Sequence, residues 1–281
     1  MTQAIQKKLN DSAFARWTAL ILVALTMFFG YMFVDVLSPL QNMLESTRGW
    51  SPTIFGLYGG SEFILNVCGF LLVAGIILDK MGVRFTGILS ASLMVLGAGI
   101  KFYGLSNYFY EGGFGYEFLS SFLTDIPASA KLACLGFMVF GCGTEMAGVT
   151  VSRAIVKWFT GKELALAMGL EMAIARLGVF AVFSLSPWVA NWGGDPSVAR
   201  PVAVVGLLLC IGLLTYIAFS VMDFKLDRQT EADTPIGETE EPFKVADLKN
   251  LFSSKTFLIV SALCVLYYSA IFPFQRFATG M

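Results

Sequence analysis

The sequence is 281 residues long, 56% of them hydrophobic and only 14% charged, with a formal net charge of −1. Soluble domains carry roughly a quarter charged residues, so this composition excludes an ordinary soluble domain, and the balanced charge excludes a basic surface for nucleic acid. The chain contains no histidine, and its five cysteines lie in apolar runs without metal-ligand spacing. We therefore expect a membrane protein that is not an enzyme and needs neither a metal nor another cofactor.

Seven apolar stretches, separated by polar segments, follow a polar tail at residues 1–16. A helix needs about 20 apolar residues to cross a bilayer, and stretches of this kind lie at residues 17–40, 52–78, 85–103, 130–155, 163–190, 201–222 and 256–277. The first stretch is too long for the core of a signal peptide, so we expect it to be retained as a helix. The sequence thus predicts an all-α, multi-pass membrane protein with seven spans in the lipid bilayer.

Lysine and arginine are distributed unequally between the two sides of the predicted spans. Of the 19 basic residues, thirteen lie in the segments that share a side with the N-terminus, five lie on the opposite side, and Arg176 lies inside a span. Cytoplasmic segments of membrane proteins carry an excess of lysine and arginine. The N-terminus is therefore expected in the cytoplasm.

The predicted spans form a bundle of six helices, residues 17–222, and a seventh helix that starts a second bundle, residues 256–281. The stretch between them, residues 223–255, begins polar and acidic and ends in FKVADLKNLF, where apolar and charged residues alternate at helical spacing. We expect a cytoplasmic linker with a short amphipathic helix on the membrane surface. This plan is typical of one six-helix half of a transporter, followed by the first helix of its second half.

The segment GIILDKMGVR joins the second and third predicted spans. In the order G-x-x-x-D-K-x-G-x-R it holds Gly75, Asp79, Lys80, Gly82 and Arg84. This pattern resembles the signature loop of the major facilitator superfamily. The resemblance implies a transporter of twelve helices that works by alternating access between two halves. The loop of this family often continues with another basic residue, whereas Phe85 follows here.

The same loop predicts a gate on the cytoplasmic side. A tight turn requires Gly82, and Gly75 would let helices approach closely. Asp79 can pair with a cation at the end of a neighbouring helix, for which Arg153 is the candidate. Such an ion pair would latch the cytoplasmic side in its closed state. The alternative is that the loop charges only follow the positive-inside bias.

Two further stretches, KWFTGKELALAMG at 157–169 and AIFPFQRFA at 270–278, resemble the branch that includes lysosomal dipeptide transporters and their bacterial relatives. The family has twelve helices, and this sequence stops at Met281, after the seventh. Either it is a fragment or the gene is truncated, and without the missing half we do not expect it to transport. A bacterial inner membrane is the default location, and a lysosomal membrane is the alternative for a eukaryotic chain.

One glutamate stands inside the apolar stretch FGCGTEMAGVTVSR, where a charge at the bilayer centre costs about 2.5–3.5 kcal/mol. This residue, Glu145, lies 13 residues before Trp158, and Arg176 lies 13 residues after Glu163. With a rise of 1.5 Å per residue, both charges are about 20 Å from the turn that joins their helices. Small residues occupy the same helix faces. We therefore expect the two charges to oppose each other and to line a central cavity.

A carboxylate and a guanidinium together suit a zwitterionic substrate. Arg176 can hold a carboxylate through two parallel hydrogen bonds, and Glu145 can accept an ammonium; the resemblance to dipeptide transporters implies the same roles. The sequence therefore predicts a secondary or facilitative transporter of small zwitterions such as dipeptides, with the proton as a candidate coupled ion. Three alternatives stay open: a structural ion pair between two helices, an organic anion carrier that uses only the arginine, and a non-transporting protein built on half a transporter.

Four more polar residues in the spans are weaker candidates for the substrate site. Glu171 suits either a proton site or a pair with a basic group near the cytoplasmic side. Glu62 and Asn66 share one face of the second span, where lining the cavity competes with an interhelical hydrogen bond. Asp35 lies near the outer end of the first span, where proton coupling or substrate gating competes with an interfacial cap or a pair with Lys101.

Overall fold

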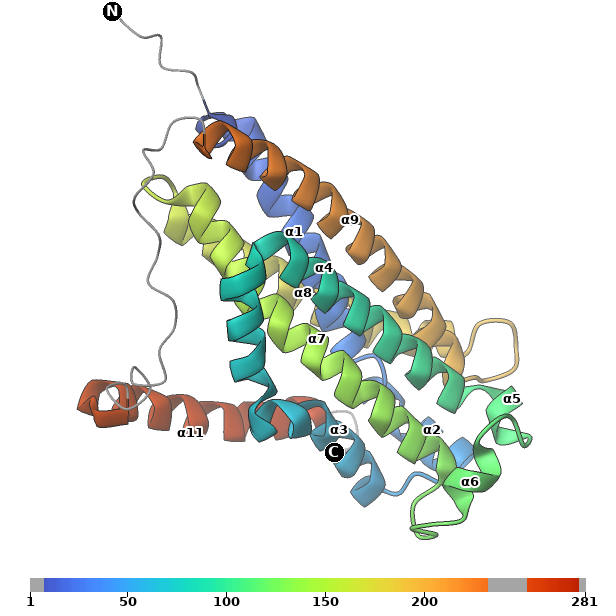
Figure 1. The fold of residues 1–281 in the computed structure, drawn as a ribbon. Coiled ribbons are helices and arrows are strands. Elements are labelled where there is room, and N and C mark those ends of the chain that lie inside the picture. The colour runs from blue at the N-terminus through green and yellow to red at the C-terminus, as the bar shows by residue number, and fades with distance from the viewer. Residues whose placement is uncertain (1–7, 232–251, 278–281) are drawn as a thin grey trace, which may run out of the picture. The chain divides into compact units, whose positions relative to one another are not determined.

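The computed structural model describes residues 8–231 and 252–277, and every regular element within these ranges is a helix (Figure 1). The chain divides into two compact units, Met1–Thr234 and Pro235–Met281. Nine α-helices belong to the described part of the first unit, and α11 belongs to the second. Their bounds are α1 Ala13–Val34, α2 Gln41–Arg48, α3 Pro52–Leu65, α4 Leu71–Leu105, α5 Asn107–Tyr110, α6 Tyr116–Ser120, α7 Ala128–Phe159, α8 Leu164–Ala190, α9 Ala199–Glu231 and α11 Lys255–Phe277.

Five helical stretches of the first unit are long and apolar enough to cross a membrane, namely Ala13–Arg48, Pro52–Leu105, Ala128–Phe159, Leu164–Ala190 and Ala199–Thr230. The second stretch has 54 residues. As one straight helix it would extend about 80 Å, far beyond a hydrocarbon core of about 30 Å. The chain reverses within it at Gly82, whose backbone angles, φ 74° and ψ 174°, are not helical (Figure 1). This stretch therefore provides two crossings, and the six predicted spans of the first bundle are all present.

Two of these spans differ from the prediction in local detail. The first helix, α1, ends at Val34 instead of reaching residue 40. Pro39 has no N–H group with which to continue the helical hydrogen bonds, and the Ser38 N–H bonds the Asp35 carbonyl oxygen at 3.0 Å instead. The second span is interrupted by a π-helical turn, Asn66–Phe70, whose Gly69 has a φ of 107°. Glycine populates this conformation without a steric penalty.

The predicted boundary between the bundle and the linker, at residue 222, is wrong, because α9 continues to Glu231. Asp223 is only 1% exposed, so it belongs to the packed bundle and does not begin a solvated linker. The predicted amphipathic helix in FKVADLKNLF lies outside the described residues, apart from its final Phe252. In the second unit, α11 agrees with the seventh predicted span to within one residue.

The consecutive helices α7 and α8 pack on different partners. The main neighbour of α7 is α4, whereas the main neighbour of α8 is α1. Glycines set both pairings, since they let two backbones approach closely. A Cβ added at Gly136 would lie 2.6 Å from the backbone nitrogen of Lys101, and one added at Gly178 would lie 2.4 Å from the carbonyl oxygen of Phe28. The hairpin of α7 and α8 is therefore not a packed pair of helices.

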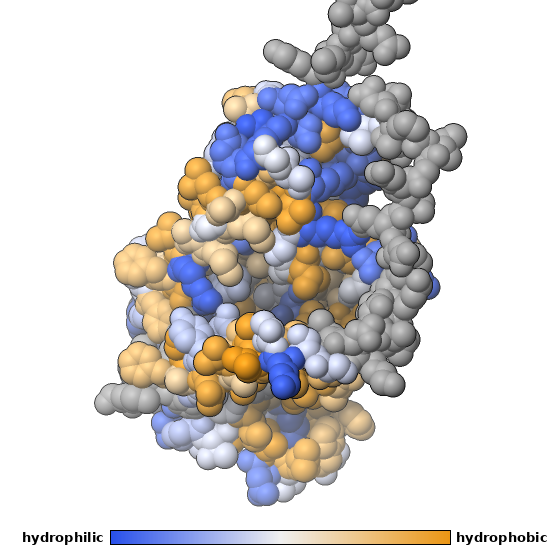
Figure 2. All heavy atoms as spheres, turned by 90° about the vertical axis from the view of Figure 1, so that its left-hand side faces the viewer, coloured by the Kyte–Doolittle hydropathy of each residue, from blue (hydrophilic) through white to orange (hydrophobic). Residues whose placement is uncertain are grey.

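The first unit has two chemically different ends. Hydrophilic side chains gather at the end where α1 begins and α9 ends, and the surface below them is largely hydrophobic (Figure 2). We call this the ionic end, defined by Asp79, Arg84, Arg153, Lys157 and Asp223. The opposite end carries α2, α5 and α6 (Figure 1). We call it the aromatic end, after the exposed aromatic residues Tyr108, Tyr110, Phe114 and Phe118.

Candidate functional site

The signature loop at the ionic end carries the ion pair that the sequence predicts. Arg153 Nη1 donates a hydrogen bond to Asp79 Oδ1. The two side chains stay 37% and 42% exposed, so water reaches the pair. Gly82 adopts the positive φ of a tight turn, as predicted, and Lys80 is exposed. No close helix approach is made at Gly75 among the described residues, since a Cβ added there would meet nothing within 4 Å.

The last residue of the loop, Arg84, joins a second cluster of charges with α7 and α9. Its Nη2 lies 3.2 Å from Asp227 Oδ2. Lys157 Nζ lies 2.8 Å from Asp223 Oδ2 and 2.6 Å from Asp227 Oδ1. Trp158 Nε1 donates to Asp223 Oδ1 at 3.0 Å. Because Asp223 is buried, these donors replace the hydration that its carboxylate has lost.

Asp223 and Asp227 were not among the predicted site residues, because they come after the sixth apolar run and fall within the predicted linker. A usable signal was present in the sequence. The two carboxylates are four residues apart, so they lie on one face if the helix continues. Hydrophobicity alone ends the span at the last apolar residue, and it cannot show that a helix continues into a buried charge cluster.

A third group of charges ties the start of α1 to the turn between α7 and α8. Arg16 Nη2 lies 3.1 Å from Glu163 Oε2, and Lys162 Nζ lies 2.9 Å from Asp11 Oδ1. The hydrogen bond from Lys162 holds the pKa of Asp11 below its usual value. The pKa of Glu163 is also lowered, first by a hydrogen bond from its own backbone and then by Arg16. Both acids are therefore charged when this contact is made.

In the middle of the spans, the predicted ion pair between Glu145 and Arg176 is absent. The Glu145 carboxylate, which is partly buried, has no hydrogen bond or ion pair with any residue that the structure describes. The Arg176 guanidinium is exposed and lies 5.2 Å from the centre of the Tyr31 ring of α1. Equal depth did not bring the two charges together, because α8 packs on α1 rather than on α7. The alternative of a structural ion pair between two helices is excluded by the same observation.

The face of α7 that carries Glu145 approaches α3 through a glycine. A Cβ at Gly141 would lie 2.1 Å from the carbonyl oxygen of Glu62. Asn66 Nδ2 donates to the Gly141 carbonyl oxygen at 3.2 Å, which is the interhelical hydrogen bond that the sequence left as an alternative. Gly148 lies one turn beyond Glu145 on α7, and Gly169 lies on α8 before Arg176. A Cβ added at either glycine would have nothing within 4 Å. Small residues there leave open space beside the charged positions.

The remaining acidic candidates have separate surroundings. Asp35 is 4% exposed, and its Oδ1 accepts a hydrogen bond from Ser38 Oγ at 3.0 Å, so it caps the turn that follows α1. Glu171 is 8% exposed and has no ion pair within the described part of the chain, so the predicted basic partner is not seen. Across residues 8–231 and 252–277, no three His, Cys, Asp or Glu side chains are grouped as metal ligands.

A buried cation, Lys101 of α4, lies near the outer end of the third predicted span, where it was predicted only as a candidate partner of Asp35. Its side chain is completely buried, and its Nζ lies 4.3 Å from the ring centre of Phe33, 4.5 Å from that of Phe137 and 5.0 Å from that of Tyr58. Three aromatic faces on α1, α7 and α3 therefore surround one ammonium, an arrangement that favours a desolvated cation. No local sequence pattern predicts these aromatic surroundings of Lys101, because the three rings come from distant segments.

Comparison with known proteins decides the family. The family model of the Major Facilitator Superfamily matches residues 20–280. The chain belongs to this superfamily. The match covers both units and agrees with the signature loop at the ionic end. It also agrees with the expectation of a transport protein rather than an enzyme.

Curated relatives within the superfamily carry the name lysosomal dipeptide transporter MFSD1. The protein of Pongo abelii is 27% identical over 271 residues, which cover 92% of this chain and 52% of the relative. That of Gallus gallus is 35% identical over 145 residues, 50% of this chain and 32% of the relative. That of Homo sapiens is 32% identical over 146 residues, 50% of this chain and 30% of the relative. This chain thus spans about half the length of these relatives at most, and no solved structure matches it.

Proposed function

We propose that this chain supplies the first half, and the first helix of the second half, of a secondary transporter that moves small zwitterionic solutes such as dipeptides by alternating access. Membership of the Major Facilitator Superfamily and relatives named lysosomal dipeptide transporters support this proposal. The observation that carries the substrate class is the state of Glu145 and Arg176. Neither of these two ionisable groups in the spans is neutralised by an ion pair with a described residue.

A zwitterion supplies the two countercharges that these groups lack. Arg176 presents five N–H donors and can bind a substrate carboxylate through two parallel hydrogen bonds. The carboxylate of Glu145 accepts hydrogen bonds from an ammonium. Unpaired charges in lipid are costly, so a ligand that pairs both of them gains binding free energy. The open space at Gly148 and Gly169 supports room for such a ligand beside these faces.

The four weaker candidates receive different weights in this proposal. Asp35 and Asn66 already bond neighbouring groups and serve packing first. Glu62 stays a candidate lining residue on α3. Glu171 is the candidate proton site, since a mostly buried carboxylate without an ion pair can be neutralised by protonation. Proton coupling is therefore part of the proposal, with Glu171 as its carrier.

The ionic end is proposed as the cytoplasmic side and as a gate, consisting of Gly75, Asp79, Lys80, Gly82, Arg84 and Arg153. The excess of lysine and arginine on that side supports a cytoplasmic N-terminus. A solvent-exposed ion pair such as Asp79–Arg153 is worth at most about 1 kcal/mol. It can therefore open during each transport cycle without a large barrier, as a latch requires.

An organic anion carrier is the second candidate function. The observation that favours it is the exposed guanidinium of Arg176, which is free of Glu145 and can bind a carboxylate by itself. For the location, we propose a multi-pass protein of the lysosomal membrane in a eukaryote, which the names of the relatives support, or of the inner membrane in a bacterium.

The test is ligand-induced thermal stabilisation of the full-length gene product in detergent, with dipeptides, free amino acids and organic acids as ligands. For a zwitterion carrier, dipeptides stabilise the wild type, and both Glu145→Gln and Arg176→Ala abolish this shift. For an anion carrier, only Arg176→Ala abolishes it. If no dipeptide stabilises the wild type, the dipeptide proposal fails. Lys225→Gln, an exposed substitution outside the proposed gate and substrate site, is the control for a general loss of stability.

A further inference from the structure

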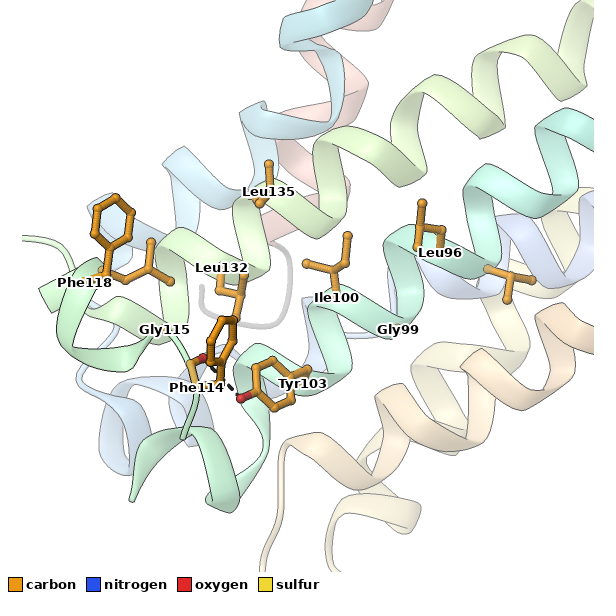
Figure 3. Close-up of a pocket in the computed structure, with 11 residues that line it drawn as sticks. Leu96, Gly99, Ile100, Tyr103, Phe114, Gly115, Phe118, Leu132 and Leu135 are labelled. Carbon is orange, nitrogen blue, oxygen red and sulfur yellow. Dashed lines mark hydrogen bonds between the residues drawn. The ribbon is translucent and has the colours of Figure 1, made fainter. Parts of the chain in front are cut away.

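A groove of about 720 Å³, which we call the aromatic groove, lies at the aromatic end between α4 and α7. Its lining residues include Leu96, Gly99, Ile100, Phe114, Phe118 and Leu135. Figure 3 shows Leu96 and Ile100 on α4, Leu132 and Leu135 on α7, and Phe114 and Phe118 from the connecting segment around the same space. Its volume is that of a small-molecule site, and its lining side chains carry no charge.

The segment between α4 and α7 is fixed over this groove. Tyr103 Oη donates a hydrogen bond to the Phe114 carbonyl oxygen at 3.2 Å (Figure 3). The completely buried Phe109 packs edge-on against Tyr103 and Tyr116, with ring centres 5.4 and 5.5 Å apart. Lys131 Nζ donates to the Leu119 carbonyl oxygen at 2.5 Å. The wall of the groove is therefore built by specific contacts.

The surface around the groove continues the surface that the spans present to lipid. Leu96 and Leu135 are 56% and 50% exposed on helices that cross the membrane. The connecting segment adds Phe114 at 91% and Phe118 at 71% exposure. Apolar surface of this size is unfavourable in water, and aromatic residues gather where a bilayer meets water. The exposed apolar surface around the groove is therefore of the kind that a bilayer covers.

A cation stands at the rim. Lys131 precedes the lining residue Leu132, and its ammonium also bonds the carbonyl oxygen of Phe122. An ammonium has three N–H donors, and two of them are used by the carbonyls of Leu119 and Phe122. The third donor and the positive charge suit an anionic oxygen. An apolar groove with a cation at its rim matches a phospholipid, which has an apolar chain below a phosphate.

We propose that the aromatic groove binds one acyl chain of a bilayer phospholipid, with the phosphate of the same lipid at Lys131. A second groove of about 380 Å³ flanks α4 on the side of α9 and shares Val95 and Gly99 with the first. The other acyl chain of the lipid occupies it. This site is separate from the substrate charges on α7 and α8, and it does not depend on the transport proposal.

Gly99 offers a direct test, because it is exposed, has nothing within 4 Å of an added Cβ, and lines both grooves. Gly99→Leu fills the space that the lipid would use. Gly60→Leu is the matched control: Gly60 is also exposed, on α3, with nothing within 4 Å, and it lines neither groove. Leu135→Trp fills the aromatic groove from the opposite wall, and it decides the test if Gly99→Leu does not fold.

The measurement is native mass spectrometry of the purified chain after delipidation and addition of phosphatidylglycerol. We expect retained phosphatidylglycerol on the wild type and on Gly60→Leu, and a fall of about tenfold for Gly99→Leu, since the lost contacts of two methylene groups already correspond to that ratio. Circular dichroism and gel filtration establish that each variant is folded.

Three results would overturn the proposal. The first is equal lipid retention by the wild type, Gly99→Leu and Leu135→Trp. The second is a wild-type dimer that Gly99→Leu turns into a monomer, because a second copy of the chain would then cover the groove. The third concerns the headgroup: equal retention of a diacylglycerol with the same chains would remove the role of Lys131. None of these readouts involves a transported substrate, so this proposal and the transport proposal fail separately.

Discussion

The ionic end and the middle of the spans differ in whether their charged side chains have ionic partners within the described fold. At the ionic end, Asp223 is buried with Lys157 beside it, and the exposed Asp79 pairs with Arg153. In the middle of the spans, Glu145 and Arg176 have no ionic partner among the described residues. A charge that the fold itself compensates contributes to structure. A charge that the described fold leaves uncompensated is a candidate site for a ligand, which is the basis of the transport proposal.

The largest expected effect is the loss of a buried carboxylate at the ionic end. Asp223→Asn leaves the ammonium of Lys157 with a weaker partner and removes an acceptor of the Trp158 N–H group. Breaking a buried ion pair destabilises a protein by about 3 kcal/mol or more. Denaturant unfolding in detergent measures this loss. Asp227→Asn, at a more exposed position, is the control, and equal losses for the two variants would contradict the structural role of burial.

A smaller effect is expected for the exposed pair of the signature loop. A double-mutant cycle with Asp79→Ala and Arg153→Ala should give a coupling energy of about 0.2–1 kcal/mol, because water screens this pair. Unfolding free energies of the two single variants and the double variant supply the cycle. A coupling of several kcal/mol would mean a rigid clamp, which is incompatible with a latch that opens in every cycle.

The contact between the start of α1 and the α7–α8 turn should show a weak pH dependence. Asp11 and Glu163 have pKa values below their ordinary values of 3.8 and 4.5. A lowered pKa contributes stability above the ordinary pKa, and this contribution disappears as the pH falls through the lowered value. The unfolding free energy should therefore decline as the pH is lowered from about 6 to about 3. The decline should be shallower in an Asp11→Asn/Glu163→Gln variant, and an unchanged slope would contradict the assignment.

The smallest effect is expected at Glu145. The substitution Glu145→Gln removes a partly buried charge that has no ionic partner, so the unfolding free energy without ligand should change by less than about 0.5 kcal/mol or should increase. It is the same carboxylate-to-amide change as Asp223→Asn, which makes the two variants a matched pair. A loss at Glu145 as large as that at Asp223 would show that a fixed partner, and not a substrate, compensates this charge.

The parts of the fold that could be predicted are those that neighbouring residues determine. Apolar length located the six crossings of the first unit and α11, because a span needs a minimum run of residues that tolerate lipid. The turn at Gly82 followed from a short motif, since loop geometry is a local property. The pair of Asp79 with Arg153, 74 residues apart, was predicted because both residues lie at span ends on the side that carries the excess of basic residues. The end of α9 could not be predicted from hydropathy, because burial of Asp223 depends on donors from α4 and α7.

By itself, the sequence determined that the chain is a multi-spanning member of a transporter family, and it predicted which charges lie within the spans and at which depth. Only the tertiary structure decided which helices touch. Glycines at Gly136 and Gly178 place α7 on α4 and α8 on α1, and this separates Glu145 from Arg176. The physical reason is that depth follows from a rise of about 1.5 Å per residue along one helix. Which charges meet depends on the close packing between helices, and residue spacing along a single helix does not predict that packing.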